Sequence, residues 1–290
     1  MGFLFRLLAR LPLPVLHNLG ALLGWLIWLL SPTYRRHLKE NTAQAGSVAV
    51  AARHAAVAET GKSLPELPKL WLRPQDEVVG RVVKVSGWEL VEAAWGAGRG
   101  ILFLTPHLGC FEIAAQYYAA HRPITALYRR PKQAWLAPIM ESGRGANLKL
   151  APADLSGVRK LIKALRTGEA VGILPDQVPK QGEGVWAPFF GRPAYTMTLA
   201  ARLAQTGATV IFAFGERLHY GAGYHLRLFA PVGDVTTPAG INREIERLVL
   251  MCPEQYLWGY NRYKGTPPAV RIPATPDAEI AGLPEPLERA

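Results

Sequence analysis

Apolar and polar positions divide the chain into an N-terminal apolar segment, a helical stretch and a long alternating region. Residues 11–34 carry no charged side chain, and the run LGALLGWLIWLL at 19–30 is apolar throughout. From about residue 80 onward, short apolar runs alternate with segments of helical period. The predicted strands are VVKVSG, ILFLT, ITALYRR and AVGILP, and the predicted helices are WELVEAAWGAG, FEIAAQYYAAH and LSGVRKLIKALRTG. This alternation is typical of an α/β sheet.

The last third of the alternating region predicts a helix, a strand pair and a final helix. YTMTLAARLAQTG at 195–207 has the pattern of a helix, and TVIFAFGERL and YHLRLFAPV follow as two strands. The short connection between these strands makes them antiparallel. INREIERLVLMCPEQYLWGYNRYKG at 241–265 predicts a last helix with an aromatic and basic end. The fold class is therefore α/β, with a mixed, mainly parallel central sheet flanked by helices.

We expect three parts along the chain, with no internal repeat. They are an N-terminal membrane anchor at 1–34, one globular domain at 35–265 and a proline-rich tail at 266–290. After the anchor, Ser31 and Pro32 predict the N-cap and first residue of a helical stretch that reaches about residue 74. We expect breaks in this stretch at Gly46, Gly61, Pro65 and Pro68.

The N-terminal apolar segment predicts contact with a membrane. Its length approaches the roughly 20 residues that a spanning helix needs, but Pro12 and Pro14 weaken its first part. Spanning and interfacial insertion both remain open, and a buried core helix is the competing interpretation. A cleaved signal peptide is disfavoured, because no small-residue cleavage site follows the run. Basic residues on both sides of the segment give no clean orientation, although an interfacial or re-entrant helix leaves both flanks cytoplasmic.

Composition and charge narrow the possible partners. With 49% apolar and 19% charged residues, the chain is not a disordered polyelectrolyte. A net charge of +11 suits nucleic acid, an anionic membrane, or an acidic substrate or carrier. We find no nucleic-acid-binding motif and therefore expect no nucleic acid partner. Cys110 and Cys252 form no metal-ligand cluster, and the histidines form no recognisable ligand set, so we expect no metal and no cofactor.

The segment TPHLGCFE places His107 and Glu112 directly after the apolar run ILFL. Within one regular helix, an offset of five residues would turn the two side chains about 140° apart. With His107 on a loop and Glu112 in the next helix, the carboxylate could instead reach the imidazole. Such a pair can act as a general base and its orienting acid, and remove a proton from an acceptor hydroxyl that then attacks an acyl carbon. A surface histidine beside a helix, without a catalytic role, would give the same sequence pattern.

Three further groups are candidates for binding. Arg129 and Arg130 follow a predicted strand and could bind a phosphate or carboxylate or stabilise an oxyanion, or could be a solvated pair. Asp176 and Gln177 begin a glycine-rich and proline-rich loop that could surround a polar head group or could be purely structural. Arg262 could meet the membrane interface or an acidic carrier, or could be a cation at a helix end.

Several segments in order resemble one known family. They are the N-terminal apolar anchor, TPHLGCFE, LYRRP, LSGVRKLIKALRTGEAVGILPDQ, GVWAPFFGRPAYTMTLAARLAQTGATVI and PEQYLWGYNRYKG. Between about residues 13 and 265, the chain is similar to the lipid A biosynthesis lauroyl/myristoyl acyltransferases of the lysophospholipid acyltransferase superfamily. The H-x4-D/E motif of that superfamily matches His107 and Glu112.

The resemblance implies transfer of a fatty acyl group from an acyl-carrier-protein thioester to a hydroxyl of a lipid A precursor. It implies a location at the cytoplasmic face of the cell inner membrane, with His107 and Glu112 as the catalytic pair. The doubled arginine in LYRRP leaves open which residue is the substrate-side arginine, and we favour Arg129 over Arg130.

Two other functions remain as alternatives. One is an acyltransferase of the same fold that acts on another glycolipid or a lysophospholipid. The F-P-E-G-T block typical of glycerolipid acyltransferases does not occur here, and GILPDQ stands at the comparable strand end. The other is a non-catalytic membrane-binding protein, which would tolerate substitution of His107.

Overall fold

A seven-stranded sheet forms the centre of the molecule. The computed structural model describes residues 2–131, 133, 135–142 and 147–265, so the predicted tail at 266–290 lies outside the described residues. Neighbouring strands follow the order β1 (Val82–Ser86), β9 (Tyr224–Phe229), β8 (Thr209–Arg217), β2 (Ile101–Leu104), β5 (Ala170–Ile173), β3 (Ile124–Tyr128) and β4 (Leu148–Pro152). The pair β8 and β9 is antiparallel and all other neighbours are parallel. The predicted fold class is confirmed.

Helices cover both faces of this sheet. Side chains alternate along β2, so that Leu102 and Leu104 pack on one face while Ile101 and Phe103 pack on the other. The first face is covered by α9 (Leu155–Arg166), α10 (Leu199–Ala204), α11 (Pro238–Met251) and part of α4 (Ser47–Leu72). The second face is covered by α6 (Glu89–Gly96) and α7 (Phe111–Ala119). Burial on both faces explains why ILFL is apolar at every position.

A separate hairpin replaces part of the predicted loop and helix around residue 190. Strands β6 (Gly184–Phe189) and β7 (Arg192–Met197) pair antiparallel, with Phe189 opposite Arg192. Phe190 and Gly191 connect them with φ of 47° and 74°, as a two-residue hairpin turn requires. The helix predicted from residue 195 therefore begins only at Leu199.

The final helix is shorter than predicted. Helix α11 ends at Met251, and a short 3₁₀ turn, η2 (Pro253–Gln255), follows it. Pro253 cannot continue the helix, because it has no N–H and restricts the residue before it. The remaining residues to 265 run as turns. The structure also contains further elements that we did not predict, among them α8 (Leu136–Ser142), β4 and the 3₁₀ turn η1 (His219–Gly221).

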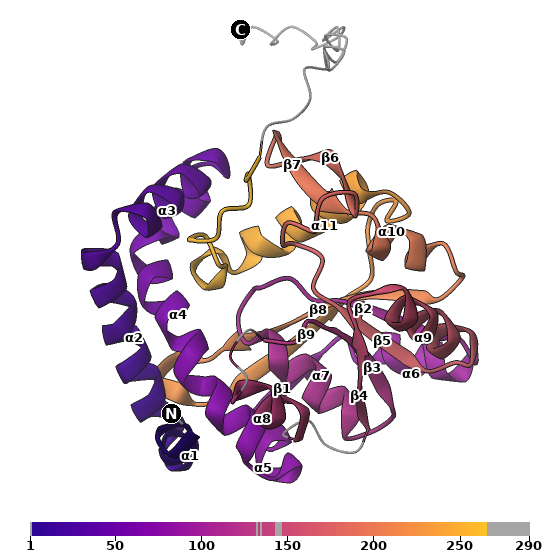
Figure 1. The fold of residues 1–290 in the computed structure, drawn as a ribbon, viewed down its shortest axis with the longest axis horizontal. Helices are drawn as coiled ribbons and strands as arrows, with labels where there is room; N and C mark the ends of the chain where they lie inside the picture. The colour runs from indigo at the N-terminus through magenta and orange to yellow at the C-terminus, as the bar shows by residue number, and fades with distance from the viewer. Residues whose placement is uncertain (1, 132, 134, 143–146, 266–290) are drawn as a thin grey trace, which may run out of the picture.

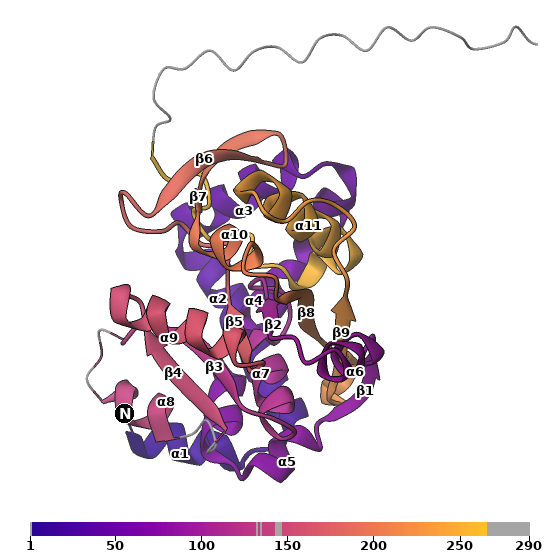
Figure 2. The same cartoon turned by 90° about the vertical axis from the view of Figure 1, so that its right-hand side faces the viewer.

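The N-terminal helices form one side of the molecule (Figures 1 and 2). They are α1 (Gly2–Arg10), α2 (Leu13–Leu30), α3 (Pro32–Gln44), α4 and α5 (Gln75–Val79). Ser31 caps α3 as expected, by accepting a hydrogen bond from the Tyr34 amide. A break occurs at Gly46, but α4 continues through Gly61, Pro65 and Pro68, so three of the predicted breaks are wrong.

Gly61 allows close packing of α2 against α4 and does not break α4. Helix α2 crosses α4 so closely that a Cβ at Gly61 would overlap the backbone of Gly20 and Gly24. The packing of α2 along α4 therefore depends on small residues in both helices. Helix α2 is also the helix of the described chain that is long and apolar enough to cross a membrane, and only 28% of it is buried.

Candidate active site

Two neighbouring parallel strands bring His107 and Asp176 together. Strand β2 ends at Leu104 and β5 ends at Ile173, and these two residues are partners in the sheet. Each polar residue stands three positions beyond its strand end. The imidazole Nδ1 of His107 lies 2.7 Å from Oδ1 of Asp176, and the His107 backbone N–H donates to Oδ2 at 2.9 Å. One carboxylate therefore fixes both the ring and the backbone of the histidine.

The charge of Asp176 determines how the imidazole is used. Burial raises the pKa of Asp176, but the charge of His107, the hydrogen bonds from His107 and the charge of Arg262 outweigh burial and lower it overall. The carboxylate is therefore ionised and accepts a hydrogen bond from Nδ1–H. Nε2 then carries the free lone pair, and the ring, whose side chain is 15% exposed, lines the adjacent pocket. This arrangement is that of a general base with its orienting acid.

Backbone contacts hold the histidine loop from two sides. The Leu257 amide donates to the His107 carbonyl at 3.2 Å, and the Gly109 amide donates to the Gln255 carbonyl at 3.0 Å. From β8, the Gly215 carbonyl accepts from the Cys110 amide at 2.7 Å. Gly109 has a φ of 60°, and a Cβ there would overlap the Gly215 carbonyl. The position therefore requires glycine.

A buried ion pair between Arg217 and Glu66 supports the same loop. The Arg217 guanidinium donates to the Gly109 carbonyl at 2.9 Å and to Glu66 at 2.6 Å. His17 Nε2 and the Tyr224 hydroxyl also lie within hydrogen-bond distance of Glu66. Burial raises the pKa of Glu66, but Arg217 and His17 outweigh burial and lower it to about 2. The carboxylate thus joins α2, α4 and the strands beneath the candidate base.

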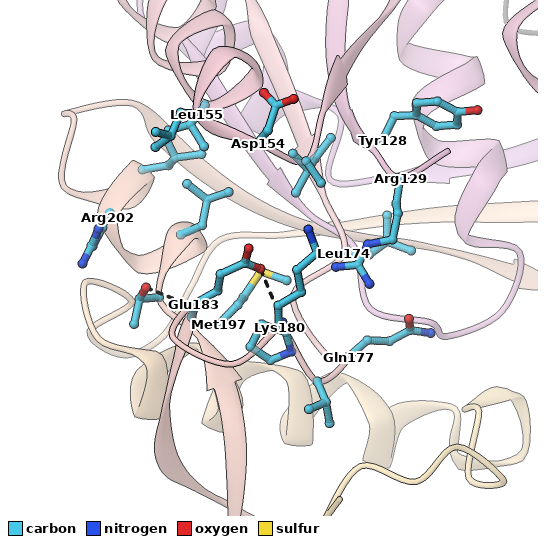
Figure 3. A pocket seen from close by; sticks show the side chains of 18 of the residues that line it. Tyr128, Arg129, Asp154, Leu155, Leu174, Gln177, Lys180, Glu183, Met197 and Arg202 are labelled. Atoms are coloured by element: carbon cyan, nitrogen blue, oxygen red, sulfur yellow. Dashed lines mark hydrogen bonds between the residues drawn. The ribbon is translucent and has the colours of Figure 1, made fainter. Parts of the chain in front are cut away.

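A large pocket lies beside His107, which is one of its lining residues. Figure 3 shows this pocket with Arg129, Gln177 and other side chains that line it. It has a volume of about 850 Å³, within the usual range for small-molecule sites. Its apolar wall comes mainly from α9, α10 and the strand ends, with Leu127, Val158, Ile162, Leu174, Met197, Leu199 and Leu203. Its polar side chains include Arg129, Lys180 and Arg202, with Glu112, Asp154 and Glu183. The shape suits a long apolar substrate with a polar or charged end.

The pocket brings together most of the residues predicted from the sequence. Glu112 stands in the first turn of α7 and lines the pocket, as do Arg129 and Gln177. Asp176 is 2% exposed behind His107. Arg130 is exposed beside Arg129 and is not among the lining residues. The aromatic side chains of the hairpin, Trp186, Phe189 and Phe190, are not among the lining residues.

Arg262 is enclosed rather than exposed at a helix end. Its guanidinium donates to the Tyr195 carbonyl and to the Thr196 hydroxyl, both at 2.8 Å, and lies 5.1 Å from the centre of the Phe189 ring. These contacts fasten the C-terminal segment to the hairpin. The charge of Arg262 also helps to lower the pKa of Asp176. Arg262 therefore affects the site through Asp176, without lining the pocket.

The sequence matches a known family over nearly its whole length. The profile of the family described as bacterial lipid A biosynthesis acyltransferase matches residues 1–265. The chain belongs to this family. It is therefore an acyltransferase of lipid A biosynthesis, and the resemblance seen in the sequence is confirmed.

Individual relatives agree with this assignment. This acyltransferase is 29% identical over 280 residues to a lipid A biosynthesis lauroyltransferase of Escherichia coli K12, covering 91% of this chain and 90% of the relative. It is 27% identical over 277 residues to a lipid A biosynthesis palmitoleoyltransferase of the same strain, covering 89% and 88%. A lipid A biosynthesis acyltransferase of Haemophilus influenzae is 25% identical over 296 residues, covering 91% and 89%.

One contact of this acyltransferase was missed in the sequence. We expected Glu112 to orient His107 and Asp176 to bind substrate, but the hydrogen bond at Nδ1 joins His107 to Asp176. A signal for this contact was present, because both residues stand at the same offset from the ends of apolar strands. The carboxyl ends of adjacent parallel strands meet at one edge of a sheet. The adjacency of these two strands could not be read from the sequence.

Proposed function

We propose that the enzyme transfers a fatty acyl chain from an acyl-carrier-protein thioester to a hydroxyl of a lipid A precursor. The observation that carries this proposal is the imidazole of His107, which is fixed by Asp176 and lines a mainly apolar pocket of about 850 Å³. A base beside an apolar pocket suits direct transfer of a long acyl chain to a hydroxyl.

In the proposed reaction, Nε2 of His107 removes the proton of the acceptor hydroxyl as its oxygen attacks the thioester carbonyl carbon. The tetrahedral intermediate then collapses, the carbon–sulfur bond breaks, and the imidazolium returns the proton to the leaving thiolate. Asp176 stabilises the imidazolium through Nδ1 during both steps. The products are an ester on the lipid and a free thiol on the carrier.

We assign the remaining polar residues of the pocket to charge stabilisation and binding. Glu112 completes the catalytic group from the pocket wall, where its negative charge favours the imidazolium that forms during transfer. Arg129 stabilises the oxyanion or a phosphate of the acceptor, and Gln177 contacts the polar head. Arg130 contributes to binding outside the pocket wall. Arg262 keeps Asp176 charged.

A covalent route through Cys110 is disfavoured. Burial raises the pKa of the Cys110 thiol well above its usual value, and the charge of Glu66 raises it further. The side chain is 1% exposed and does not line the pocket. Because the thiolate is the nucleophilic form, this cysteine is unreactive.

We propose that the enzyme works at the cytoplasmic face of the cell inner membrane. Helix α2 exposes the leucines Leu19, Leu22, Leu26, Leu29 and Leu30, and α1 exposes Phe3, Leu4 and Leu7. Arg6 and Arg10 lie within α1, and Arg35, Arg36 and Lys39 follow α2. An apolar face with basic flanks suits a surface of anionic lipids. In this proposal, residues 1–34 anchor the acyltransferase domain at 35–265.

The proposal is tested with purified enzyme, acyl-carrier protein loaded with a labelled fatty acid, and a lipid A precursor. Mass spectrometry should show one added acyl chain in ester linkage, and Cys110→Ala should give the same product at a similar rate. Parallel reactions offer a lysophospholipid or another glycolipid as the acceptor. Efficient transfer to one of these acceptors, with none to the lipid A precursor, would contradict the proposed acceptor.

A further inference from the structure

Helix α9 combines a pocket wall with a row of exposed cations. Leu155, Val158 and Ile162 line the pocket, while Leu161 and Ala164 pack in the core. The remaining surface of the helix carries four exposed basic residues, which we call the basic stripe: Arg159, Lys160, Lys163 and Arg166. At about 100° per residue, the stripe covers a sector of about 120° directly next to the residues that line the pocket.

The basic stripe is largely unpaired within the described part of the protein. None of its four residues forms an ion pair there, and α9 contains no acidic residue between Leu155 and Arg166. Asp154 is the N-cap of the helix and accepts hydrogen bonds from the Ser156 and Gly157 amides. The charge of Lys160 helps to lower the pKa of Asp154, but the two side chains form no ion pair. Glu169 beyond the helix is paired with Lys149.

Interaction with the helix dipole does not explain the whole stripe. Cations are favoured in the last turn of a helix, which accounts for Lys163 and Arg166. Arg159 and Lys160 stand in the middle of α9, where the dipole gives little benefit. Four exposed cations that form no ion pair with the described residues, beside a substrate pocket, indicate an acidic partner.

The position of the stripe argues against the membrane as that partner. Helices α2 and α9 lie on opposite sides of the molecule, as the two perpendicular views show (Figures 1 and 2). The helix that carries the exposed leucines therefore lies across the molecule from the helix that carries the basic stripe. If α2 rests on the bilayer, the stripe faces the aqueous phase, where a soluble carrier approaches.

We infer that the basic stripe is the docking surface for the acidic protein carrier that delivers the acyl thioester to the pocket. This inference rests on the proposed function, because it requires a protein-bound acyl donor. A carrier seated on α9 places its thioester at the mouth of the pocket that α9 itself helps to line. Complementary charge of this kind mainly accelerates association and makes it sensitive to salt.

The test compares two double variants with the same change in charge. Arg159→Glu with Lys163→Glu reverses two charges of the stripe. Lys84→Glu with Arg243→Glu reverses two exposed charges on β1, at the opposite edge of the sheet, and on α11. Each variant is assayed with acyl-carrier protein and with a neutral acyl-pantetheine thioester, which lacks the protein. Circular dichroism and vesicle sedimentation report folding and membrane binding.

With the carrier donor at low salt, the stripe variant should lose at least about tenfold in kcat/KM, mainly through a higher KM. Added salt should narrow the difference from wild type. The acyl-pantetheine reaction should be unchanged, and the control variant should match wild type with both donors. A milder pair, Arg159→Gln with Lys163→Gln, should show an intermediate loss.

Four results would overturn the inference. An unchanged kcat/KM with the carrier donor in a folded stripe variant rules out docking at α9. An equal loss with both donors, together with weaker sedimentation with anionic vesicles, assigns the stripe to the membrane. If the wild-type enzyme uses acyl-pantetheine but not the carrier thioester, the carrier is excluded as the donor, while acyl transfer itself stands. If the wild-type enzyme is inactive with every donor, the proposed function fails as well.

Discussion

At the scale of single residues, the position of the candidate base depends on a carboxylate 69 residues away in the sequence. Asp176 binds Nδ1 and the backbone amide of His107, so the ring cannot rotate without breaking the contact to a buried charge. Nε2 therefore stays at the pocket. This geometry suits proton removal from a lipid hydroxyl, because the same carboxylate stabilises the imidazolium that results.

Asp176→Asn should lower kcat by about 10²-fold to 10⁴-fold, because the amide cannot stabilise the imidazolium or fix its tautomer. The KM values should change little, since the side chain is buried behind His107. Steady-state kinetics with a lipid A precursor measures both effects.

Glu112→Gln provides the matched comparison. It removes a charge that faces the pocket without releasing Nδ1, so kcat should fall less, on the order of tenfold. If the kcat of Asp176→Asn stays within about threefold of wild type while Glu112→Gln is inactive, Glu112 is the orienting acid. That result would reverse the assignment.

At the scale of elements, a buried network joins the N-terminal helices to the sheet. Glu66 on α4 contacts Arg217 on β8, His17 on α2 and Tyr224 on β9. Arg217 in turn supports the carbonyl of Gly109. Damage to this network should therefore reduce both stability and activity.

Glu66→Gln should lower the free energy of unfolding by about 3–5 kcal/mol, because it leaves the Arg217 charge buried without its partner. The pKa of Glu66 is lowered from 4.5 to about 2 in the folded protein. Its ionised form thus stabilises the fold above pH 4.5, and this contribution disappears as the pH falls towards 2.

Urea unfolding across this pH range should show the largest difference between wild type and Glu66→Gln near neutral pH. Glu169→Gln is the control, since Glu169 pairs with the exposed Lys149 and should be worth no more than about 1 kcal/mol. Equal effects of the two substitutions would contradict a structural role for the buried network.

Gly61→Ala tests the close contact between α2 and α4. The added methyl group has no room, so the protein should lose about 1–3 kcal/mol of stability. Gly96→Ala is the matched control, because a Cβ at that helical position meets nothing within 4 Å. It should be neutral or slightly stabilising. Thermal unfolding of both variants decides whether the helix contact requires glycine.

Local patterns in the sequence predicted the strands of the sheet better than they predicted turns and contacts between helices. The apolar run at β2 and its alternation with helices were sufficient to give the fold class, because burial on both faces leaves a clear signal. The turn at Phe190 was missed, since a non-glycine residue with positive φ is uncommon there. Gly61 was interpreted as a break, because the residue that requires a glycine there, Gly24 on α2, lies 37 residues away in the sequence.

The same limit applies to the site. His107, Glu112, Arg129 and Gln177 were all found from their places after strands or in the motif, and all line one pocket. The contact between His107 and Asp176 depends on which strands are neighbours, and that is a property of the whole sheet. No spacing in the sequence contains this information.

At the scale of the whole molecule, two opposite sides suit two different environments. The exposed leucines of α2 suit a lipid surface, while the basic stripe of α9 suits a soluble acidic partner. The pocket and His107 belong to the region that an acyl donor and a lipid acceptor must both reach. Such an arrangement matches a transfer reaction at a membrane surface.

Leu22→Gln combined with Leu29→Gln should weaken binding to anionic vesicles by at least about tenfold, because burying each leucine in lipid contributes about 1.5–3 kcal/mol. Both side chains are largely exposed, at 69% and 60%, so folding should be unaffected. Leu155→Gln on α9 is the control, and vesicle sedimentation gives the readout. Equal binding of the double variant and wild type would contradict membrane contact through α2.

The most direct test of the central claim is the single-turnover rate of acyl transfer from acyl-carrier protein to a lipid A precursor in His107→Ala. We predict a rate about 10²-fold to 10⁴-fold below wild type, with carrier binding unchanged. Transfer by this variant at the wild-type rate would show that the imidazole beside Asp176 is not the base of the reaction.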